Sequence, residues 1–577
     1  MNAEKYFENN DLVIKKKYDA LKDFFYNKED APAVAKKYDY KLSAFYSLSR
    51  DFKKYLKSGE KEDFFFKEKQ VGRKHIDNRK LDNIIIKLRK KNHSTKNILT
   101  ILHSKSYKVS YTYVYTLLKK EGFAKLPRRS GGAEKELPKI EAPKSKHIEI
   151  KNEVFNSDNV GLLSFMVLLK KYKITDLIEK SLFPETKTIN RLSSILCFIA
   201  LKLSNVRRYS VDDMWCMDRG LGLFAGLNVL PKTAWFSSYS HRVTKDMNLA
   251  FLKSLHQVWI ENNLLSDTIN LDFTTIPYWG DDEHLENNWS GKRNKALSSM
   301  LAVLAQDPDS GIIDYGDVDI RHNKQNETVL EFLDFYSDNP SKNNKLKYLV
   351  FDSKFTTYQN LSKLNQRKIK FLTIRRRGKN IVEKINNKDK SLWKKVRVEC
   401  ADAKRRNIRA IDETIELSKY EGNVRQVAIK GHGKIKPALI ITNDFDLSLE
   451  SIVRKYARRW VVEKVISEQI EFFHLNRVSS SMVVKVDFDL TMTILSHNLY
   501  RLIAKEFERY SNFTSVKIYE KFIRNSGVVK IDKDKITVSM NKKRDLPLIL
   551  ETMKKNENTK IDWLGNKKII FSGSSTT

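Results

Sequence analysis

The chain has 577 residues, of which 107 are Lys or Arg and 71 are Asp or Glu, so its formal net charge is +36. An excess of positive charge of this size indicates a polyanionic partner, most often nucleic acid. With 41% apolar and 11% aromatic residues the composition excludes a disordered tail and suits several folded domains.

Secreted, disulfide-rich and membrane classes are also excluded. The three cysteines are scattered and too few for a disulfide framework or a zinc cluster, which fits a reducing compartment. The first residues, MNAEKYFENNDL, lack the apolar core of a signal peptide. The longest apolar stretch, residues 192–203, is too short to span a bilayer. We therefore expect a cytoplasmic protein.

The N-terminal part predicts two small helical units. Apolar residues recur at helical spacing in three short segments of residues 1–60, and residues 70–124 repeat the pattern. In both units, two short helices, a tight turn and a third helix favour a helix-turn-helix. Ser94 and Ser110 are the expected N-caps of the last two helices in the second unit.

The third helix of the second unit is the candidate DNA-reading element. Its outward side chains would be hydroxyls, a tyrosine pair and a lysine, which suit phosphates and base edges: Thr112, Tyr113, Tyr115, Thr116 and Lys119. A plain three-helix bundle with a solvated basic face is the alternative, and at 1–60 the two readings are evenly balanced. Residues 125–148, rich in Pro, Gly and charge, are the expected linker.

Residues 149–266 are predicted as a helical domain without a catalytic constellation. From residue 267 the pattern changes to strand–strand–strand–helix–strand–helix–strand, an α/β core with antiparallel strands first and parallel ones after. Asp272 and Asp352 lie on two separate buried strands of this core. The aspartates at 314, 317 and 319 alternate along another strand, where we expect them on its exposed face.

Two converging buried carboxylates repel each other unless a divalent cation lies between them. Oxygen ligands suit Mg²⁺ or Mn²⁺. A third carboxylate, Glu463, lies in a predicted long helix, residues 449–475, with Tyr456 and Arg459 on the same face. Two metal ions held there would serve phosphoryl transfer, with Arg459 and Tyr456 holding a phosphate.

These segments resemble the DDE transposases of bacterial insertion sequences. The resemblance rests on LDFTTIPYWGDD, YLVFDSKFTTYQNLSKLN, FLTIRRRGKN and YARRWVVEKVISE. It is greatest to the branch with a β-rich insertion before the catalytic Glu and a Tyr-x2-Arg-x3-Glu-x6-Lys signature. It implies a multidomain α + α/β protein whose RNase-H-like core, residues 267–377 and 445–512, is interrupted by a β-rich insertion, residues 378–444.

The resemblance also implies the site. The triad would be Asp272, Asp352 and Glu463, with Tyr456 and Arg459 matching the signature's Tyr and Arg. Where the signature has Lys, this chain has Ile470. Arginines of the core and insertion would form a phosphate-binding surface: Arg375, Arg376, Arg377, Arg405 and Arg406. Trp393 is expected to pack in the insertion rather than stack on a base.

The implied activity is that of a mobile-element transposase. It would bind the terminal inverted repeats in double-stranded DNA, cleave the element ends and join the 3′-OH ends to target DNA, acting as a homodimer. The alternatives are a transposase-derived DNA-binding protein without activity, which Ile470 favours, and a plain RNase-H-like nuclease. The C-terminal region, residues 513–577, is expected to contain a helix and a strand and to end in a disordered tail.

Overall fold

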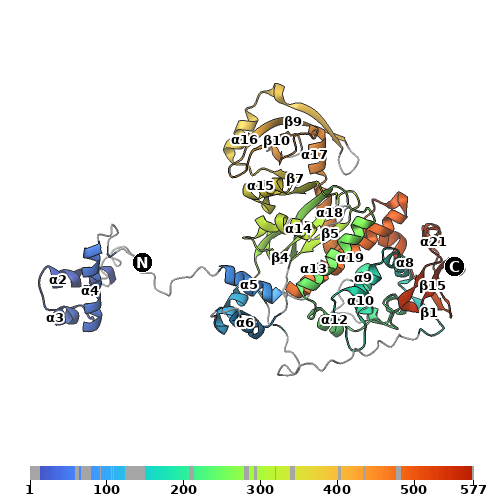
Figure 1. Ribbon diagram of the computed structural model, residues 1–577, viewed down its shortest axis with the longest axis horizontal. Coiled ribbons are helices and arrows are strands. Elements are labelled where there is room, and N and C mark those ends of the chain that lie inside the picture. Colours follow the sequence, from blue (N-terminus) through green and yellow to red (C-terminus); the bar gives the residue numbers. More distant parts are fainter. Residues whose placement is uncertain are drawn as a thin grey trace, which may run out of the picture. The chain divides into compact units, whose positions relative to one another are not determined.

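The chain forms two compact units, Met1–Arg79 and Lys80–Thr577 (Figure 1). The computed structural model describes residues 13–58, 64–65, 79–90, 93–104, 107, 109–123, 126, 150–206, 214–277, 285–290, 295–318, 320–337, 345–399, 405–432, 437–475 and 483–574. The expected linker, residues 125–148, lies outside the described residues apart from Leu126.

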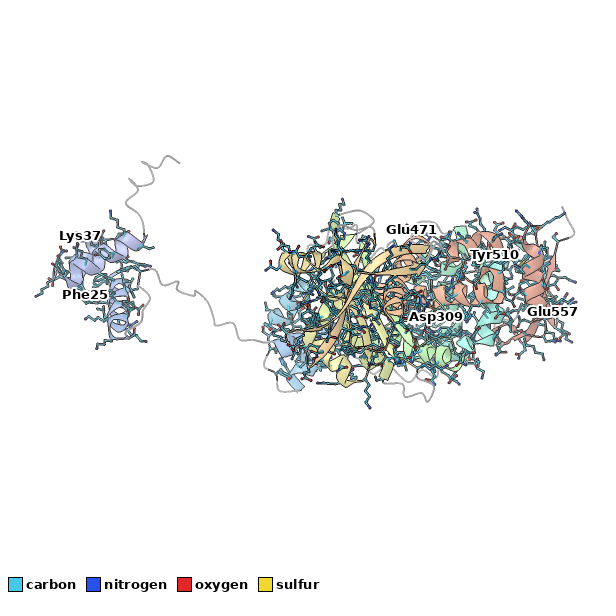
Figure 2. The ribbon with its side chains drawn as sticks, turned by 90° about the horizontal axis from the view of Figure 1, so that it is seen from above. Phe25, Lys37, Asp309, Glu471, Tyr510 and Glu557 are labelled. Carbon is cyan, nitrogen blue, oxygen red and sulfur yellow. The ribbon has the colours of Figure 1, made fainter. Side chains whose placement is uncertain are left out.

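The first unit contains three short helices, α2 (Val13–Phe25), α3 (Ala31–Lys37) and α4 (Leu42–Ser58). Their apolar stripes meet in a small core around Val34 and Phe45. Lys37, labelled with Phe25 in Figure 2, donates to Asp23 at 2.7 Å, and Tyr38 donates to the same carboxylate at 2.7 Å. The bond from Lys37, supported by that from Tyr38, lowers the pKa of Asp23 to about 2.

The second unit begins with three more helices, α5 (Arg79–Lys90), α6 (Thr95–Ser104) and α7 (Tyr111–Lys120). Both expected caps are present, since Ser94 Oγ accepts from Asn97 N and Ser110 Oγ accepts from Tyr113 N, each at 3.2 Å. A compact apolar core joins the three helices, formed by Ile85, Ile98, Leu102, Val114 and Leu118.

Helices dominate the following region, as the apolar runs predict. They are η1 (Val160–Leu163), α8 (Ser164–Lys171), α9 (Ile174–Lys180), α10 (Arg191–Leu203), α11 (Arg219–Phe224), α12 (Thr233–Ser240) and α13 (Lys245–Glu261). The long α19 (Val483–Glu506) packs among α8, α10 and α13, and α10 is buried along most of its length. This bundle supports one face of the central sheet through the same apolar core.

The central sheet has the predicted strand order. Its core elements are β2 (Thr268–Pro277), β4 (Lys295–Gln306), β5 (Ile313–Asp317), α14 (Thr328–Ser337), β6 (Tyr348–Phe351), α15 (Tyr358–Gln366) and β7 (Lys370–Ile374). The strands lie side by side as β5–β4–β2–β6–β7. The first three pair antiparallel, and β6 and β7 run parallel to β2. A short β3 (Asn287–Ser290) pairs with β4.

The prediction of an exposed acidic face on β5 is wrong for two of its three aspartates. Asp314 is 1% exposed and accepts from His256 Nδ1 at 2.8 Å. Asp317 is 7% exposed and pairs with Lys245. Asp319 lies outside the described residues. Helix α13 supplies both partners, so packing against this helix buries carboxylates that the sequence pattern alone assigned to solvent.

Residues after β7 extend the same sheet. They form α16 (Lys379–Asn386), β8 (Lys394–Glu399), β9 (Arg405–Glu416), β10 (Asn423–Lys430) and β11 (Ala438–Thr442). Because β11 pairs with β7, the sheet continues as β7–β11–β10–β9–β8 (Figure 1). Trp393 is half-buried against α16, and Lys430 Nζ lies 4.4 Å from its ring centroid.

A second sheet forms near the C-terminus and includes one strand from far upstream. Its strands are β1 (Glu153–Ser157), β12 (Gly527–Ile531), β13 (Lys535–Met540), β14 (Lys560–Ile561) and β15 (Lys567–Gly573), with α21 (Leu546–Lys554) packed against it. The strand order is β1–β12–β13–β15–β14. The expected disordered tail is therefore wrong up to Gly573, because β15 pairs with β13 along six residues. No helix among the described residues is long and apolar enough to cross a membrane.

Candidate active site

The register between β2 and β6 places Asp272 and Asp352 at the same height along the strand direction. Strands β2 and β6 pair in parallel with Asn270 opposite Val350, and each aspartate lies two residues further along its own chain. Residues two apart in extended chain share a face. Both carboxylates therefore lie on the side where Val350 packs against α17 (Leu449–Ala457).

The prediction of one long helix over residues 449–475 is wrong, because the helix is interrupted. The structure contains two helices, α17 and α18 (Trp460–Glu471), separated at Arg458 and Arg459. The carbonyl of Arg458 accepts from Asn270 Nδ2 at 3.1 Å, and its guanidinium donates to Pro308 O at 2.8 Å. These contacts to β2 and to the β4–β5 turn hold the junction against the sheet. Tyr456 and Glu463 thus belong to different helices.

Arg459 reaches from this junction to the first aspartate. Its Nη1 donates to Asp272 Oδ2 at 2.8 Å, and the two side chains are 8% and 14% exposed. The other oxygen of Asp272 accepts from the backbone N of Phe273 at 2.9 Å. A charge-assisted bond at this depth is among the stronger polar contacts in a protein, so the aspartate has a fixed orientation.

Tyr456 lies beside the same group of charges. It is 9% exposed, and the centre of the Arg459 guanidinium lies 5.7 Å from its ring centroid. Burial is the main cause that raises the pKa of Tyr456 to about 12. The charge of Arg459 opposes this shift, whereas those of Asp352 and Asp272 add to it. The side chain is therefore a neutral phenol, able to donate a hydrogen bond, throughout the physiological range.

Glu463 lies in α18, which packs against β2. Its side chain lies outside the described residues, so the structure places its helix but not its carboxylate. Ile470, on the same helix, is half-buried.

Sequence reasoning missed an aromatic pair that flanks both aspartates. Phe273 follows Asp272, and Phe355 lies three residues after Asp352. Their rings stack with centroids 3.7 Å apart and planes 2° apart. This contact ties the end of β6 to β2 beside the carboxylates. The sequences LDF and FDSKF contain the signal, because each places a phenylalanine within three residues after its aspartate.

The three consecutive arginines after β7 have different surroundings. Arg376 is exposed and donates to Ser353 O at 3.3 Å, directly after Asp352. Arg375 donates to Gln426 Oε1 at 2.7 Å, and Arg377 donates to the carbonyl of Pro437. Of the three, Arg376 is thus the one that the structure brings to the aspartates. The side chains at 405 and 406 lie outside the described residues.

The candidate DNA-reading residues of α7 also divide into two groups. Thr112, Thr116 and Lys119 are exposed, in agreement with the outward face that helical spacing predicts. Tyr113 is half-buried, and its hydroxyl donates to Asp82 Oδ1 of α5 at 2.6 Å. The expectation that Tyr113 points outward is therefore wrong, because this hydroxyl finds a partner inside the bundle.

The chemistry of the aspartate pair fits a divalent cation. Two carboxylates level on adjacent parallel strands are hard oxygen ligands of the kind that Mg²⁺ and Mn²⁺ bind. Asp352 accepts from Ser353 Oγ at 3.1 Å, which orients it without adding charge. Among the described side chains no group of three or more His, Cys, Asp and Glu could hold a metal ion. A third carboxylate would have to come from a side chain outside that set, such as Glu463.

Comparison with known proteins finds one family match, to the region that contains both aspartates. Residues 265–499 match the family model described as the transposase DDE domain. This match supports a DDE transposase, an enzyme that cleaves DNA and transfers its strands. One solved structure that it resembles is described as "Cryo-EM structure of piggyBac transposase synaptic complex with hairpin DNA (SNHP)". The two are 12% identical, with a TM-score of 0.35, over 69% of this chain and 81% of that chain. No curated protein matches the sequence closely enough to count as a relative.

Proposed function

We propose that this protein is a transposase that binds the terminal inverted repeats of an insertion sequence, cleaves DNA at the element ends and joins the 3′-OH ends to target DNA. The observation that carries the proposal is the level placement of Asp272 on β2 and Asp352 directly after β6, with Asp272 bound to Arg459 at the junction of α17 and α18. The strand order β5–β4–β2–β6–β7 supports an RNase-H-like core, and β8–β11 its β-rich insertion.

In this proposal Asp272, Asp352 and Glu463 hold two Mg²⁺ or Mn²⁺ ions. When bound, the ions would activate a water or a 3′-hydroxyl and stabilise the leaving oxygen. Arg459 orients Asp272 and offsets its charge. It also presents a guanidinium close to the place where a scissile phosphate would lie. Tyr456, a neutral phenol, donates a hydrogen bond to the same phosphate.

DNA recognition is assigned to the helical units. The second unit would act as a helix-turn-helix, with Thr112, Thr116 and Lys119 of α7 contacting phosphates and base edges. Tyr113 would position α7 through its bond to Asp82 rather than touch DNA. Arg376 would bind backbone next to the aspartates. Two ends must be held together during transposition, so we also propose a homodimer, acting in the cytoplasm at the nucleoid.

One observation favours a second candidate function, a DNA-binding protein that no longer cleaves. Ile470 stands where the signature has Lys, and it is half-buried on α18. An apolar side chain there supplies no phosphate contact. In that case Asp272 would remain as a structural partner of Arg459.

A cleavage assay distinguishes the two functions. The substrate is a labelled duplex carrying the element's own terminal repeat, incubated with Mg²⁺, Mn²⁺ or EDTA. Wild type should nick at the element boundary in the presence of metal, and Glu463→Gln should not. Glu471→Gln is the matched control, since Glu471 is exposed on the same helix (Figure 2).

Two results of this assay would contradict the proposal or part of it. End-specific binding without cleavage by wild type would favour the second function, and Ile470→Lys would then be the variant expected to regain activity. Cleavage by Glu463→Gln at the wild-type rate would remove Glu463 from the proposed triad.

A further inference from the structure

The C-terminal sheet leaves one of its two faces open. Its inner face is apolar and packs on α21 and on the helical region, through buried residues such as Ile536, Val538 and Ile569 (Figure 1). The alternate residues point the other way and are exposed or half-exposed. They are Val154, Asn156, Val528, Lys530, Lys535, Thr537, Ser539, Lys560, Lys568, Ile570 and Ser572.

Three lysines stand directly opposite one another on this open face. Lys535 of β13 pairs with Lys568 of β15, and Lys568 pairs in turn with Lys560 of β14. All three are exposed, and among the described residues none of them forms an ion pair. We call these three residues the lysine row. Lys530 lies on the same face and pairs with Asp532 at 3.3 Å.

The lysine row opposes folding rather than supporting it. Like charges directly opposite each other on neighbouring strands destabilise a sheet. The strand residues of this face include no carboxylate that would offset them. Stability of the sheet therefore does not explain the row, whereas a bound polyanion would.

We propose that the open face of the C-terminal sheet binds the backbone of duplex DNA, as a second DNA surface apart from the candidate active site. Neighbouring strands lie about 4.8 Å apart, so the row spans about 10 Å, the axial rise of about three nucleotides. Beside it, the hydroxyls of Thr537, Ser539 and Ser572 can donate to phosphate oxygens. Ser539 and Ser572 lie within 3.0 Å of each other, Oγ to Oγ.

The composition of the face selects duplex backbone over other partners. Binding of single strands relies on bases stacked on aromatic rings, and the strand residues of this face include none. A second copy of the chain would bring like charge to like charge, because the net charge is +36 and the charged residues of the face are lysines. Lysines and hydroxyls make up most of the polar side chains of the face, and such groups contact the phosphate backbone, so we expect binding independent of sequence. The inference rests on the proposed function only in taking DNA as the polyanion.

The test uses the full chain and a labelled duplex of about 30 base pairs without terminal repeats, long enough for several phosphate contacts. Binding is measured by fluorescence anisotropy across a salt series. The variant is Lys535→Gln/Lys560→Gln/Lys568→Gln. Its matched control, Lys542→Gln/Lys554→Gln/Lys555→Gln, removes the same charge from exposed lysines that lie outside the open face.

The variant should weaken binding about tenfold or more at low salt. It should also reduce the magnitude of the slope of log K against log[salt] by about 2.7, since three phosphate contacts are lost and each contributes about 0.9. The control should change both quantities much less. The Tm of the lysine-row variant should equal or exceed that of wild type, because the row of like charges is gone. A separate variant, Lys535→Arg/Lys560→Arg/Lys568→Arg, should preserve binding because it keeps the three positive charges.

Four outcomes would overturn the proposal. The first three are equal losses in variant and control, a loss of binding that follows a lowered Tm, and a change of oligomeric mass without a change in DNA affinity. The fourth is equally tight binding of a single strand through the lysine row. Failure of the proposed cleavage is a separate result, because Asp272→Asn should abolish nicking and leave binding of this duplex unchanged.

Discussion

Arg459 Nη1 donates to Asp272 Oδ2 at 2.8 Å, with both side chains almost excluded from solvent. This contact joins the end of α17 to β2, and the bond from Asn270 to the carbonyl of Arg458 reinforces it. The junction from which α18 departs is thus fixed to the strand that carries the first aspartate. Helix α18, and Glu463 with it, can therefore shift only if these two bonds stretch or break.

Arg459→Gln should strengthen metal binding and at the same time lower the rate of cleavage. Without the guanidinium, Asp272 loses its charge partner, so a divalent cation should bind the aspartate pair at lower concentration. Cleavage should nevertheless fall by about 10- to 100-fold, because charge-assisted bonds are worth about 1.5–3 kcal/mol. Isothermal titration with Mn²⁺ measures the first effect, and cleavage of a labelled element end measures the second.

The neighbouring Arg458→Gln serves as the control for lost charge. Arg458 binds Pro308 O and Asp309 rather than an aspartate of the candidate site. If Arg459→Gln and Arg458→Gln change Mn²⁺ affinity equally, a direct competition between Arg459 and metal at Asp272 is ruled out.

Tyr456→Phe tests the phenol without disturbing its packing. The ring packs with Ile452, Val453 and Val350, and phenylalanine fills the same space. We expect an unchanged Tm and about a tenfold loss of cleavage, the cost of one hydrogen bond to a charged group. Because the pKa of Tyr456 is raised to about 12, the phenol stays protonated below pH 10. The pH–rate profiles of variant and wild type should therefore be parallel from pH 7 to 10; an alkaline limb present only in wild type would refute this.

Strand order and the placement of the two aspartates follow from local pattern. Apolar β-branched runs bounded by turns define β2, β4, β5, β6 and β7, and the helices between β5, β6 and β7 require parallel connections. Side-chain partners do not follow in the same way. Alternation along β5 marks Asp314 as outward, but the tertiary packing of α13 supplies His256 and buries both.

Contacts between distant segments account for the other differences. The break after Ala457 depends on Asn270, which lies far away in sequence, so helical periodicity continues through it without a signal. Tyr113 turns inward because Asp82 of another helix accepts from its hydroxyl. The C-terminal sheet is completed by β1, which precedes β12 by more than 350 residues, and a short terminal segment shows no periodicity that would predict such pairing.

Asp487 should make stability depend on pH in the acidic range. Its carboxylate is buried, accepts from Asn248 at 2.7 Å and lies near Lys245 and Asp317. Burial is the main cause that raises its pKa from 3.8 to about 6, against the opposing charge of Lys245. Since the folded state holds this proton more tightly than the unfolded state, the stabilisation is complete below pH 3.8 and is lost as pH rises through 6.

Asp487→Asn should remove this contribution. Relative to wild type, the variant should gain stability between pH 4 and 7, by at most about 3 kcal/mol for a shift of this size. Thermal unfolding of both proteins at each pH gives the difference directly. A difference in Tm that stays constant across this range would show that Asp487 does not titrate there.

Lys202 and Asp489 form a buried pair whose two members should be strongly coupled. Lys202 Nζ donates to Asp489 Oδ2 at 2.8 Å and to Phe473 O at 2.9 Å, and the side chains are 10% and 7% exposed. Lys202→Met leaves a buried carboxylate without its cation, which costs about 3–5 kcal/mol of unfolding free energy. Asp489→Leu leaves an unpaired ammonium at a similar cost.

The double variant Lys202→Met/Asp489→Leu should be more stable than either single variant, because no charge is then left buried alone. A double-mutant cycle from chemical denaturation measures the coupling, which we expect to exceed about 2 kcal/mol. Since Lys202 also binds Phe473 O, two residues after the end of α18, the double variant should still lose part of its cleavage activity through a less ordered α18. Additive losses of stability in the cycle would show that the pair is not coupled. Full activity in the double variant would show that the contact to Phe473 does not position α18.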